Sequence, residues 1–168
     1  MKPTEGPISS MASITPQQLR DALSCFATGV AIVTTVGPDG EPVGLTVDSF
    51  NSVSMDPPLI LWSLGLGAPS LPAFRQHAAF VVNILSYNQL DLCRQFATPA
   101  TDKFAGVSWQ PGLHGAPVLD QNVATLSCLN YRQYEGGDHE IFLGEVMSAA
   151  VSDLAPLIYS RGQFQSVP

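Results

Sequence analysis

The feature that most limits the fold of this chain is a series of short apolar runs, rich in β-branched residues, that are joined by turns of a few residues. The runs cover residues 30–36, 42–47, 59–64, 80–85, 123–134 and 140–151. Their length and composition are typical of β-strands. None is followed by the glycine-rich loop and helix of a parallel dinucleotide-binding unit. The pattern therefore predicts a mainly β fold, an antiparallel barrel with a few peripheral helices.

A few helices are expected around this barrel. Thr15 followed by Pro16 predicts a helix start, a hydroxyl cap with proline at the first helical position. A short helix is expected near residues 71–77, and another from Asn88, as its cap, to Ala97. The first residues lack a hydrophobic signal core, so residues 1–13 are expected to form a flexible tail and 14–168 the folded domain.

Charge is scarce in this sequence. Only 12% of the residues are charged, the net charge is −7, and no basic cluster is present. We therefore expect neither a nucleic-acid partner nor a membrane surface. A surface with so few charges predicts burial against a second copy, that is, a homodimer.

The cysteines and histidines form no recognisable metal or disulfide pattern. Cys25, Cys93 and Cys128 lie far apart and include no CxxC pair, and the three histidines have no metal-ligand spacing. We expect reduced thiols in a cytoplasmic protein and no metal site.

The segment from Val43 to Trp62 is the candidate centre of the molecule. It begins as a strand, breaks into a series of small polar residues, turns at Pro57-Pro58 and resumes as an apolar run. Small hydroxyl and amide side chains leave the backbone groups accessible to a flat, hydrogen-bonding ligand. The alternative interpretation is a strand–bulge–strand corner with a solvated polar edge, and composition alone does not decide between the two.

No hydrolytic triad or carboxylate pair stands out. The chain lacks a GxSxG motif, and nothing local ties a serine to a histidine. The remaining candidate is His139, which follows a Gly-Gly-Asp turn. Glycines allow close approach of a ligand, and a histidine at a strand mouth can hydrogen-bond an amide or a phosphate. A purely structural turn histidine is the alternative.

Five segments in order resemble the short-chain flavin reductases of the FMN-binding split-barrel superfamily, which supply reduced flavin to two-component monooxygenases. They are FATGVAIVTT (26–35), GLTVDSFNSVSMDPPLILWSL (44–64), FVVNIL (80–85), DKFAGVSW (102–109) and GGDHEIFLGEV (136–146). The resemblance extends over most of the chain. It implies a six-stranded Greek-key split barrel that dimerises, with FMN or FAD in a groove near the dimer interface.

The resemblance also implies roles for individual residues. Residues matching the isoalloxazine contacts run from Thr46 to Ser52, and Ser63 and Leu64 match a strand beneath the ring or ribityl chain. Ser70, Lys103 and Phe104 match positions at the ribityl and phosphate end, and His139 matches a histidine that contacts NADH or NADPH. The candidate cofactor-binding residues are Thr46, Val47, Asp48, Ser49, Ser52, Ser63, Leu64, Ser70, Asn83, Lys103 and Phe104, with His139 as the catalytic candidate.

Two departures from the family pattern bear on these roles. Asp48 places a carboxylate where many relatives carry an uncharged residue, and the ending around Arg161 matches only loosely.

The implied activity is hydride transfer from nicotinamide to flavin, with reduced flavin passing to a separate oxygenase. The alternatives are a flavin-binding redox module without turnover and a split-barrel flavin oxidase acting on a small organic substrate.

Overall fold

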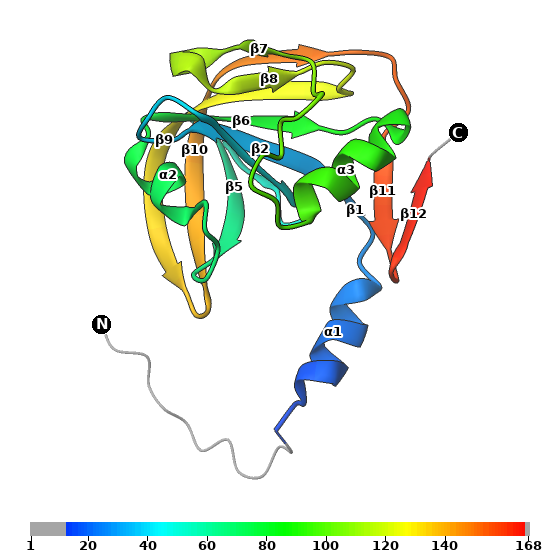
Figure 1. The fold of residues 1–168 in the computed structure, drawn as a ribbon. Coiled ribbons are helices and arrows are strands. Elements are labelled where there is room, and N and C mark those ends of the chain that lie inside the picture. The colour runs from blue at the N-terminus through cyan, green and yellow to red at the C-terminus, as the bar shows by residue number, and fades with distance from the viewer. Residues whose placement is uncertain (1–12, 167–168) are drawn as a thin grey trace.

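The structure is a computed structural model that describes residues 13–166 of the chain. The predicted N-terminal tail lies, apart from residue 13, outside the described residues. The fold is mainly β, as the series of short apolar runs predicts (Figure 1). The strands are β1 (Thr28–Gly29), β2 (Ala31–Val36), β3 (Pro42–Val47), β4 (Asn51–Met55), β5 (Pro58–Gly65), β6 (Ala79–Ile84), β7 (Trp109–Pro111), β8 (Pro117–Leu119), β9 (Ala124–Gly136), β10 (His139–Val151), β11 (Leu157–Ser160) and β12 (Gln163–Ser166). The helices are α1 (Pro16–Ser24), α2 (Leu71–Gln76) and α3 (Leu90–Ala97), with short 3₁₀ turns at Tyr87–Gln89 and Leu113–Gly115.

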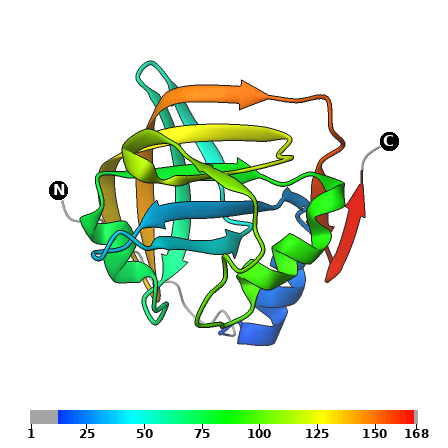
Figure 2. The same cartoon turned by 45° about the horizontal axis from the view of Figure 1, so that its top comes forward.

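The main sheet contains seven strands in the order β3-β2-β6-β9-β10-β5-β4, and every neighbouring pair is antiparallel. Its two edge strands, β3 and β4, are consecutive in the chain and only residues 48–50 separate them. The sheet must therefore curl until its edges lie next to each other, and Figure 2 shows it wrapped in this way. The ladder does not continue from β3 to β4, so the barrel has an open seam. The short edge strand β4 brings the sheet to seven strands rather than the six that the resemblance implies.

The interior of the curled sheet is aromatic. The ring of Trp62 stacks on that of Phe142, with centroids 4.8 Å apart, and meets the edges of Phe74 and Phe80. All four side chains are fully or almost fully buried. Because residues alternate across a strand, the same strands present Leu61 and the other residues between these core positions to the outside. Alternation along β5 thus fixes which residues can face a ligand outside the barrel.

A second apolar core lies outside the barrel, beneath α3. Phe96 and Cys93 of this helix pack with Ile32 of β2 and with Phe104 of the following loop. The rings of Phe96 and Phe104 meet edge to face at 4.9 Å. This core holds the loop of residues 98–104 close to β3.

Both ends of the described chain contribute to peripheral elements. α1 begins as predicted, with Thr15 and Gln18 in a reciprocal capping box, and it projects from the barrel with no buried residue (Figure 1). The third helix differs from the prediction: Ser86, not Asn88, makes the capping box, with Gln89, and a 3₁₀ turn precedes α3. No helix among residues 13–166 is long and apolar enough to cross a membrane.

Candidate functional site

The seam between the two sheet edges is held by a side chain instead of by a strand. The hydroxyl of Ser49 accepts a hydrogen bond from the amide nitrogen of Ser63 at 3.0 Å and donates to the carbonyl oxygen of Ser63 at 3.2 Å. Ser49 lies in the link between β3 and β4, beyond the point where the ladder of β4 with β5 ends at the pair Asn51–Leu61. Among residues 13–166 no strand pairs with the outer edge of β3, so its backbone groups are available to a ligand.

Helix α3 is fixed onto the outer face of β3. The Thr46 hydroxyl donates to the carbonyl oxygen of Cys93 at 2.7 Å. Two residues earlier, Gly44 lies under the ring of Phe96, and a Cβ built on it would be 2.8 Å from Phe96 Cε1. A side chain at position 44 would therefore push the helix away. Glycine here allows the close contact that shapes the adjoining cavity.

A cavity of about 760 Å³ opens beside this helix. It lies between the start of β3, the loop before α2, and the segment that follows α3. The lining consists of Glu41, Pro42, Val43, Gly44, Pro69, Ser70, Ala97, Pro99, Ala100, Thr101, Asp102, Lys103 and Phe104. Its size is within the range of small-molecule binding sites.

The Asp-Lys-Phe element of this lining is a braced turn. Asp102 Oδ1 accepts from the amide nitrogen of Phe104 at 2.9 Å, and Gln95 Nε2 donates to the carbonyl oxygen of Lys103 at 2.8 Å. The Lys103 ammonium group donates to the carbonyl oxygen of Phe96, near the C-terminal end of α3, at 2.8 Å. A cation is favourable at that end of a helix. Partial burial nevertheless lowers the pKa of Lys103, and an anion in the cavity would offset that cost.

Ser70 faces the same cavity from the residue that precedes α2. Its side chain makes no capping hydrogen bond to the helix, so the hydroxyl is accessible to a ligand. The loop that leads to it from β5 is a pair of turns, closed by Ala68 N to Gly65 O at 3.0 Å and by Leu71 N to Ala68 O at 3.1 Å. Five residues span at most about 18 Å even when fully extended, so Gly65 and Ser70 lie no farther apart than that.

His139 lies at the other end of that loop. It pairs with Gly65 in the ladder between β10 and β5, and a Cβ on Gly65 would be 3.8 Å from His139 Nε2. The Nδ1 atom is 2.7 Å from Asp138 Oδ1, and the imidazole lowers the pKa of the Asp138 carboxyl. The side chain of His139 is 49% exposed. Asp138 therefore orients an accessible imidazole whose Nε2 lies beside the end of β5.

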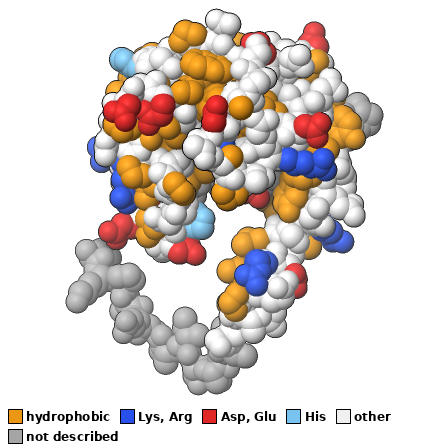
Figure 3. Space-filling view, in the orientation of Figure 1, with side chains coloured by type: hydrophobic (Ala, Val, Ile, Leu, Met, Phe, Trp, Pro, Cys, Tyr) orange, Lys and Arg blue, Asp and Glu red, His pale blue; other side chains and the backbone are white. Residues whose placement is uncertain are grey.

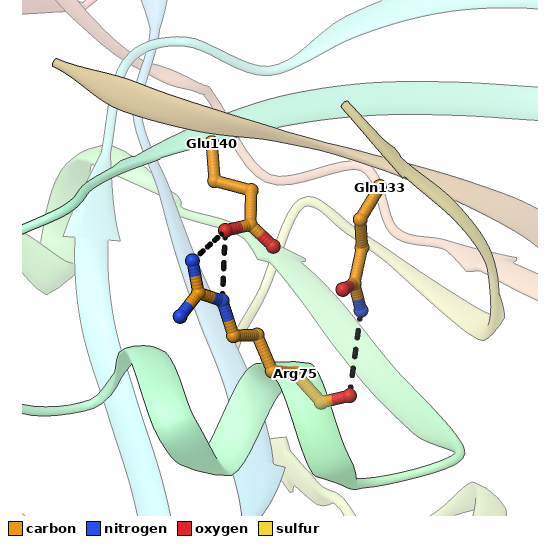
Figure 4. Close-up of polar contacts among 3 residues, drawn as sticks. All are labelled: Arg75, Gln133 and Glu140. Carbon is orange, nitrogen blue, oxygen red and sulfur yellow. Dashed lines mark hydrogen bonds and ion pairs between the residues drawn. The ribbon is translucent and has the colours of Figure 1, made fainter. Parts of the chain in front are cut away.

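The opposite face of β10 is tied to α2. The guanidinium of Arg75 donates through Nε to Glu140 Oε2 at 2.8 Å, and its Nη2 contacts the same oxygen. Gln133 of β9 donates to the Arg75 carbonyl oxygen at 3.4 Å (Figure 4). Since neighbouring strand residues point to opposite faces, this ion pair fixes the strand position from which His139 projects.

The structure brings some of the predicted site residues together and separates others. Ser70, Lys103 and Phe104 line one cavity, whereas His139 lies beyond the intervening loop. Asp48 and Ser52 are exposed at the seam. The side chains of Val47 and Leu64 point into the barrel core, so only their backbone groups can reach a ligand.

One of the predicted polar contacts is wrong, and the hydroxyls of two other predicted residues have partners within the protein. Asn83 is fully buried and donates through Nδ2 to the carbonyl oxygen of Ile32 at 3.1 Å, while its Oδ1 accepts from Leu119 N at 2.9 Å. It thus ties strands together and has no surface with which to contact a cofactor. The hydroxyls of Thr46 and Ser49 donate within the protein, so they shape the site instead of offering their protons to a flavin.

Sequence reasoning did not single out several residues that line the cavity. Glu41 and Pro69 lie in turns whose sequence does not indicate a binding site, and Thr101 lies in a segment whose sequence predicts only an irregular loop. Tertiary packing of α3 against β3 brings these segments together. A clue was available only at Gly44, a glycine in a strand, which can mark a close approach of another element.

Comparison with known proteins decides the family. The model of the flavin reductase like domain matches residues 23–168, which include the seam, the cavity and His139. The chain belongs to this family. The flavin reductase family assignment agrees with the resemblance read from the five sequence segments.

Individual relatives of this flavin reductase-like chain support the assignment. It is 40% identical over 148 residues to the FMN reductase (NADH) SmoA of Agrobacterium fabrum, covering 88% of this chain and 84% of the relative. The solved structure of Streptomyces globisporus NADH:FAD oxidoreductase SgcE6, in complex with NAD and FAD fragments, superposes with a TM-score of 0.86 at 38% identity, covering 94% of this chain and 98% of that one.

Some relatives are considerably longer. The reductase component of the flavin-dependent trigonelline monooxygenase of Acinetobacter baylyi is 38% identical over 148 residues, which cover 88% of this chain and 48% of the relative. The chain spans about half the length of such curated relatives.

Proposed function

We propose that this chain is an NAD(P)H-dependent flavin reductase, which transfers a hydride from nicotinamide to FMN or FAD. The observation that carries the proposal is the open seam between β3 and β4 beside a cavity that holds Ser70 and Lys103. Membership of the flavin reductase family supports the same activity.

The residues of the site fit a flavin. A flat ring needs hydrogen-bonding groups along one edge and an open face, and the unpaired β3 edge next to the exposed residues Asp48 and Ser52 offers both. The phosphate end needs a cation and hydroxyl donors. Lys103 and Ser70 supply these within one cavity.

The flavin, when bound, accepts the hydride, and the protein supplies position and charge. Ser49 fixes the seam, and with it the backbone that would meet the ring edge. Asp138 holds His139 Nδ1, which leaves Nε2 free to bind the incoming nicotinamide nucleotide beside Gly65. Placing two planar rings in contact supplies most of what such a transfer needs, so no catalytic acid or base is required.

Anaerobic mixing tests the activity. Purified protein with FMN or FAD should lose its oxidised-flavin absorbance on addition of NADH or NADPH, with a rate proportional to protein concentration. Flavin that binds but is bleached by neither nucleotide would instead indicate a binding module without turnover. Protein that binds no flavin at all would contradict the proposal in both forms.

The proposal includes a homodimer. α1 has no buried residue, and Leu23 and Phe26 are 63% and 72% exposed. A helix of nine residues is marginal in water by itself. Figure 3 shows hydrophobic side chains on the projecting helix. A second copy that covers Leu23 and Phe26 would account for both their exposure and the small share of charged residues in the chain.

Light scattering after size-exclusion chromatography tests the dimer. Leu23→Ser combined with Phe26→Ser should shift a dimer toward monomer, because the two changes remove apolar surface only from the end of α1 and the turn that follows it. Gln17→Ser on the same helix is the matched control and should leave the mass unchanged. A monomeric parent protein would contradict this part of the proposal.

Two further features complete the proposed role. Reduced flavin would pass to a separate oxygenase component, as the name of the trigonelline monooxygenase relative indicates for that protein. Faster dissociation of reduced than of oxidised flavin, measured anaerobically, would support delivery to a partner. The three cysteines are all free, which supports a cytoplasmic location.

A further inference from the structure

The cavity beside α3 is larger than a phosphate group requires. Its volume is about 760 Å³, toward the upper end of the usual range for small-molecule sites. In the proposed function the flavin ring lies at the seam, and only the phosphate end reaches Ser70 and Lys103. Most of the cavity would then remain for a further part of the ligand.

The lining of that remaining space is mainly apolar. Pro42, Pro69 and Pro99 contribute to it, together with Ala97 and Ala100. Small-molecule pockets are typically lined in this way, with a few polar groups that fix orientation. Glu41 and Thr101 are the polar groups of this kind here. Such a surface suits a nucleoside, whose base is planar and whose ribose offers hydroxyl donors.

The cavity offers one cation to the phosphate end of a flavin. Lys103 is the one cation among the lining residues, and Glu41 and Asp102 are carboxylates. The phosphate monoester of FMN, like a phosphorylated side chain, carries about −1.5 to −2 charges on one group at neutral pH. The pyrophosphate of FAD carries a single charge on each of its two phosphates. Both flavins therefore bring about two negative charges to one ammonium and two carboxylates, so the size and the apolar lining of the cavity, and not its charge, separate FAD from FMN.

We propose that the preferred flavin of this enzyme is the dinucleotide FAD, and that the adenylate half occupies the cavity beside α3. The inference rests on the proposed function, because that function places the phosphate end at Ser70 and Lys103. Glu41 is accordingly a specificity residue, whose carboxylate accepts a hydrogen bond from the adenylate.

Equilibrium titration of the purified full chain with riboflavin, FMN and FAD tests this preference. FAD should bind at least about tenfold more tightly than FMN. Ala100→Phe, which fills the cavity from an exposed loop position, should weaken FAD binding by about tenfold and change FMN binding less than about twofold. Ala105→Phe is the matched control in the same loop, because Ala105 is exposed and does not line the cavity. It should change neither affinity.

A second variant separates charge from shape. The Glu41 carboxylate accepts from the amide nitrogen of Asp39 at 2.9 Å, and glutamine can keep this bond. Glu41→Gln should therefore narrow the preference for FAD over FMN by a factor of about two to five, the size of one exposed charge interaction.

The outcomes distinguish the two proposals. Equal or tighter binding of FMN than of FAD, or an equal loss of both in Ala100→Phe, would overturn the dinucleotide assignment while NADH-dependent flavin reduction continues. An absence of reduction with every flavin would instead overturn the proposed function.

Discussion

The Ser49 hydroxyl bonds both backbone polar groups of Ser63, accepting from its nitrogen at 3.0 Å and donating to its oxygen at 3.2 Å. A strand neighbour would normally satisfy these two groups. At this point the Ser49 side chain takes the place of a strand beside β5. The outer edge of β3 is not paired with a strand among residues 13–166. The same contact therefore stabilises the barrel next to its seam.

Ser49→Ala should lower the free energy of unfolding by about 1–2 kcal/mol, because two half-buried backbone groups lose their partner. Flavin affinity should fall by about tenfold as the seam loosens. Chemical denaturation and flavin titration measure the two effects. Ser148→Ala is the control, since Ser148 is exposed and lies outside the proposed flavin site. A Ser49→Ala protein as stable as that control would show that the contact contributes nothing.

The sequence predicts most of the strands because their signals are local. Runs of β-branched residues between glycine and proline turns correspond to β2, β3, β5, β6, β9 and β10. The predicted cap of the third helix, Asn88, is wrong. Ser86 and Gln89 form the capping box instead, and three polar residues within four positions made the sequence ambiguous. The last two strands, β11 and β12, form a hairpin that turns at Gly162, where φ is +76°, and they lie outside the apolar runs from which the sequence predicts strands.

The site was less predictable because tertiary contacts decide it. Asn83 is an amide in an apolar strand, and a buried network node and a ligand contact produce the same sequence pattern. The structure identifies the network, which reaches Ile32, Thr34 and Asn122. Glu41 carries no local signal, because only the packing of α3 against β3 brings it to the cavity. Lys103 could be singled out since the chain has so few cations.

Lys103→Ala should weaken FMN and FAD by about tenfold or more and riboflavin much less, because riboflavin has no phosphate for the ammonium to bind. Lys103 also donates to the Phe96 carbonyl oxygen, so some general loosening of α3 is expected. The riboflavin affinity measures that loosening and serves as the internal control. Equal losses for all three flavins would remove Lys103 from the phosphate site.

His139→Ala should raise the KM for the nicotinamide nucleotide by about tenfold and leave the Kd for flavin nearly unchanged. Asp138→Asn should produce a smaller rise in the same constant, since the imidazole remains but its Nδ1 loses the carboxylate that orients it. Steady-state kinetics and flavin titration separate the two constants. A parallel loss of flavin affinity would place His139 against the flavin instead of the nucleotide.

Arg75 and Glu140 should respond unequally to mutation. The Glu140 side chain is 10% exposed and that of Arg75 is 48% exposed. Arg75→Ala leaves a buried carboxylate without its partner, whereas Glu140→Gln leaves an arginine that water can reach. We expect Arg75→Ala to lower the free energy of unfolding more than Glu140→Gln does. Urea denaturation at neutral pH measures both, and the reverse order would contradict the assigned burial.

The buried thiols should make the fold sensitive to alkali. Burial raises the pKa of Cys128 to about 12 and also raises the pKa of Cys93. The pKa of a cysteine thiol in an unfolded chain is about 8.5. Between these values the unfolded chain binds fewer protons than the folded one, so stability is fully present below about pH 8.5 and is lost as the pH rises, with a slope of up to about 1.4 kcal/mol per pH unit for each thiol.

Urea denaturation from pH 8 to pH 11 should therefore give a shallower loss of stability for Cys128→Ala than for the parent protein, whatever the offset at neutral pH. Cys25 is exposed, so Cys25→Ala is the matched control and should keep the parental slope. Lysine and tyrosine side chains also titrate in this range, but their contribution is common to all three proteins and cancels in the comparison. Identical slopes for Cys128→Ala and Cys25→Ala would mean that Cys128 is not protected from ionisation by the barrel core.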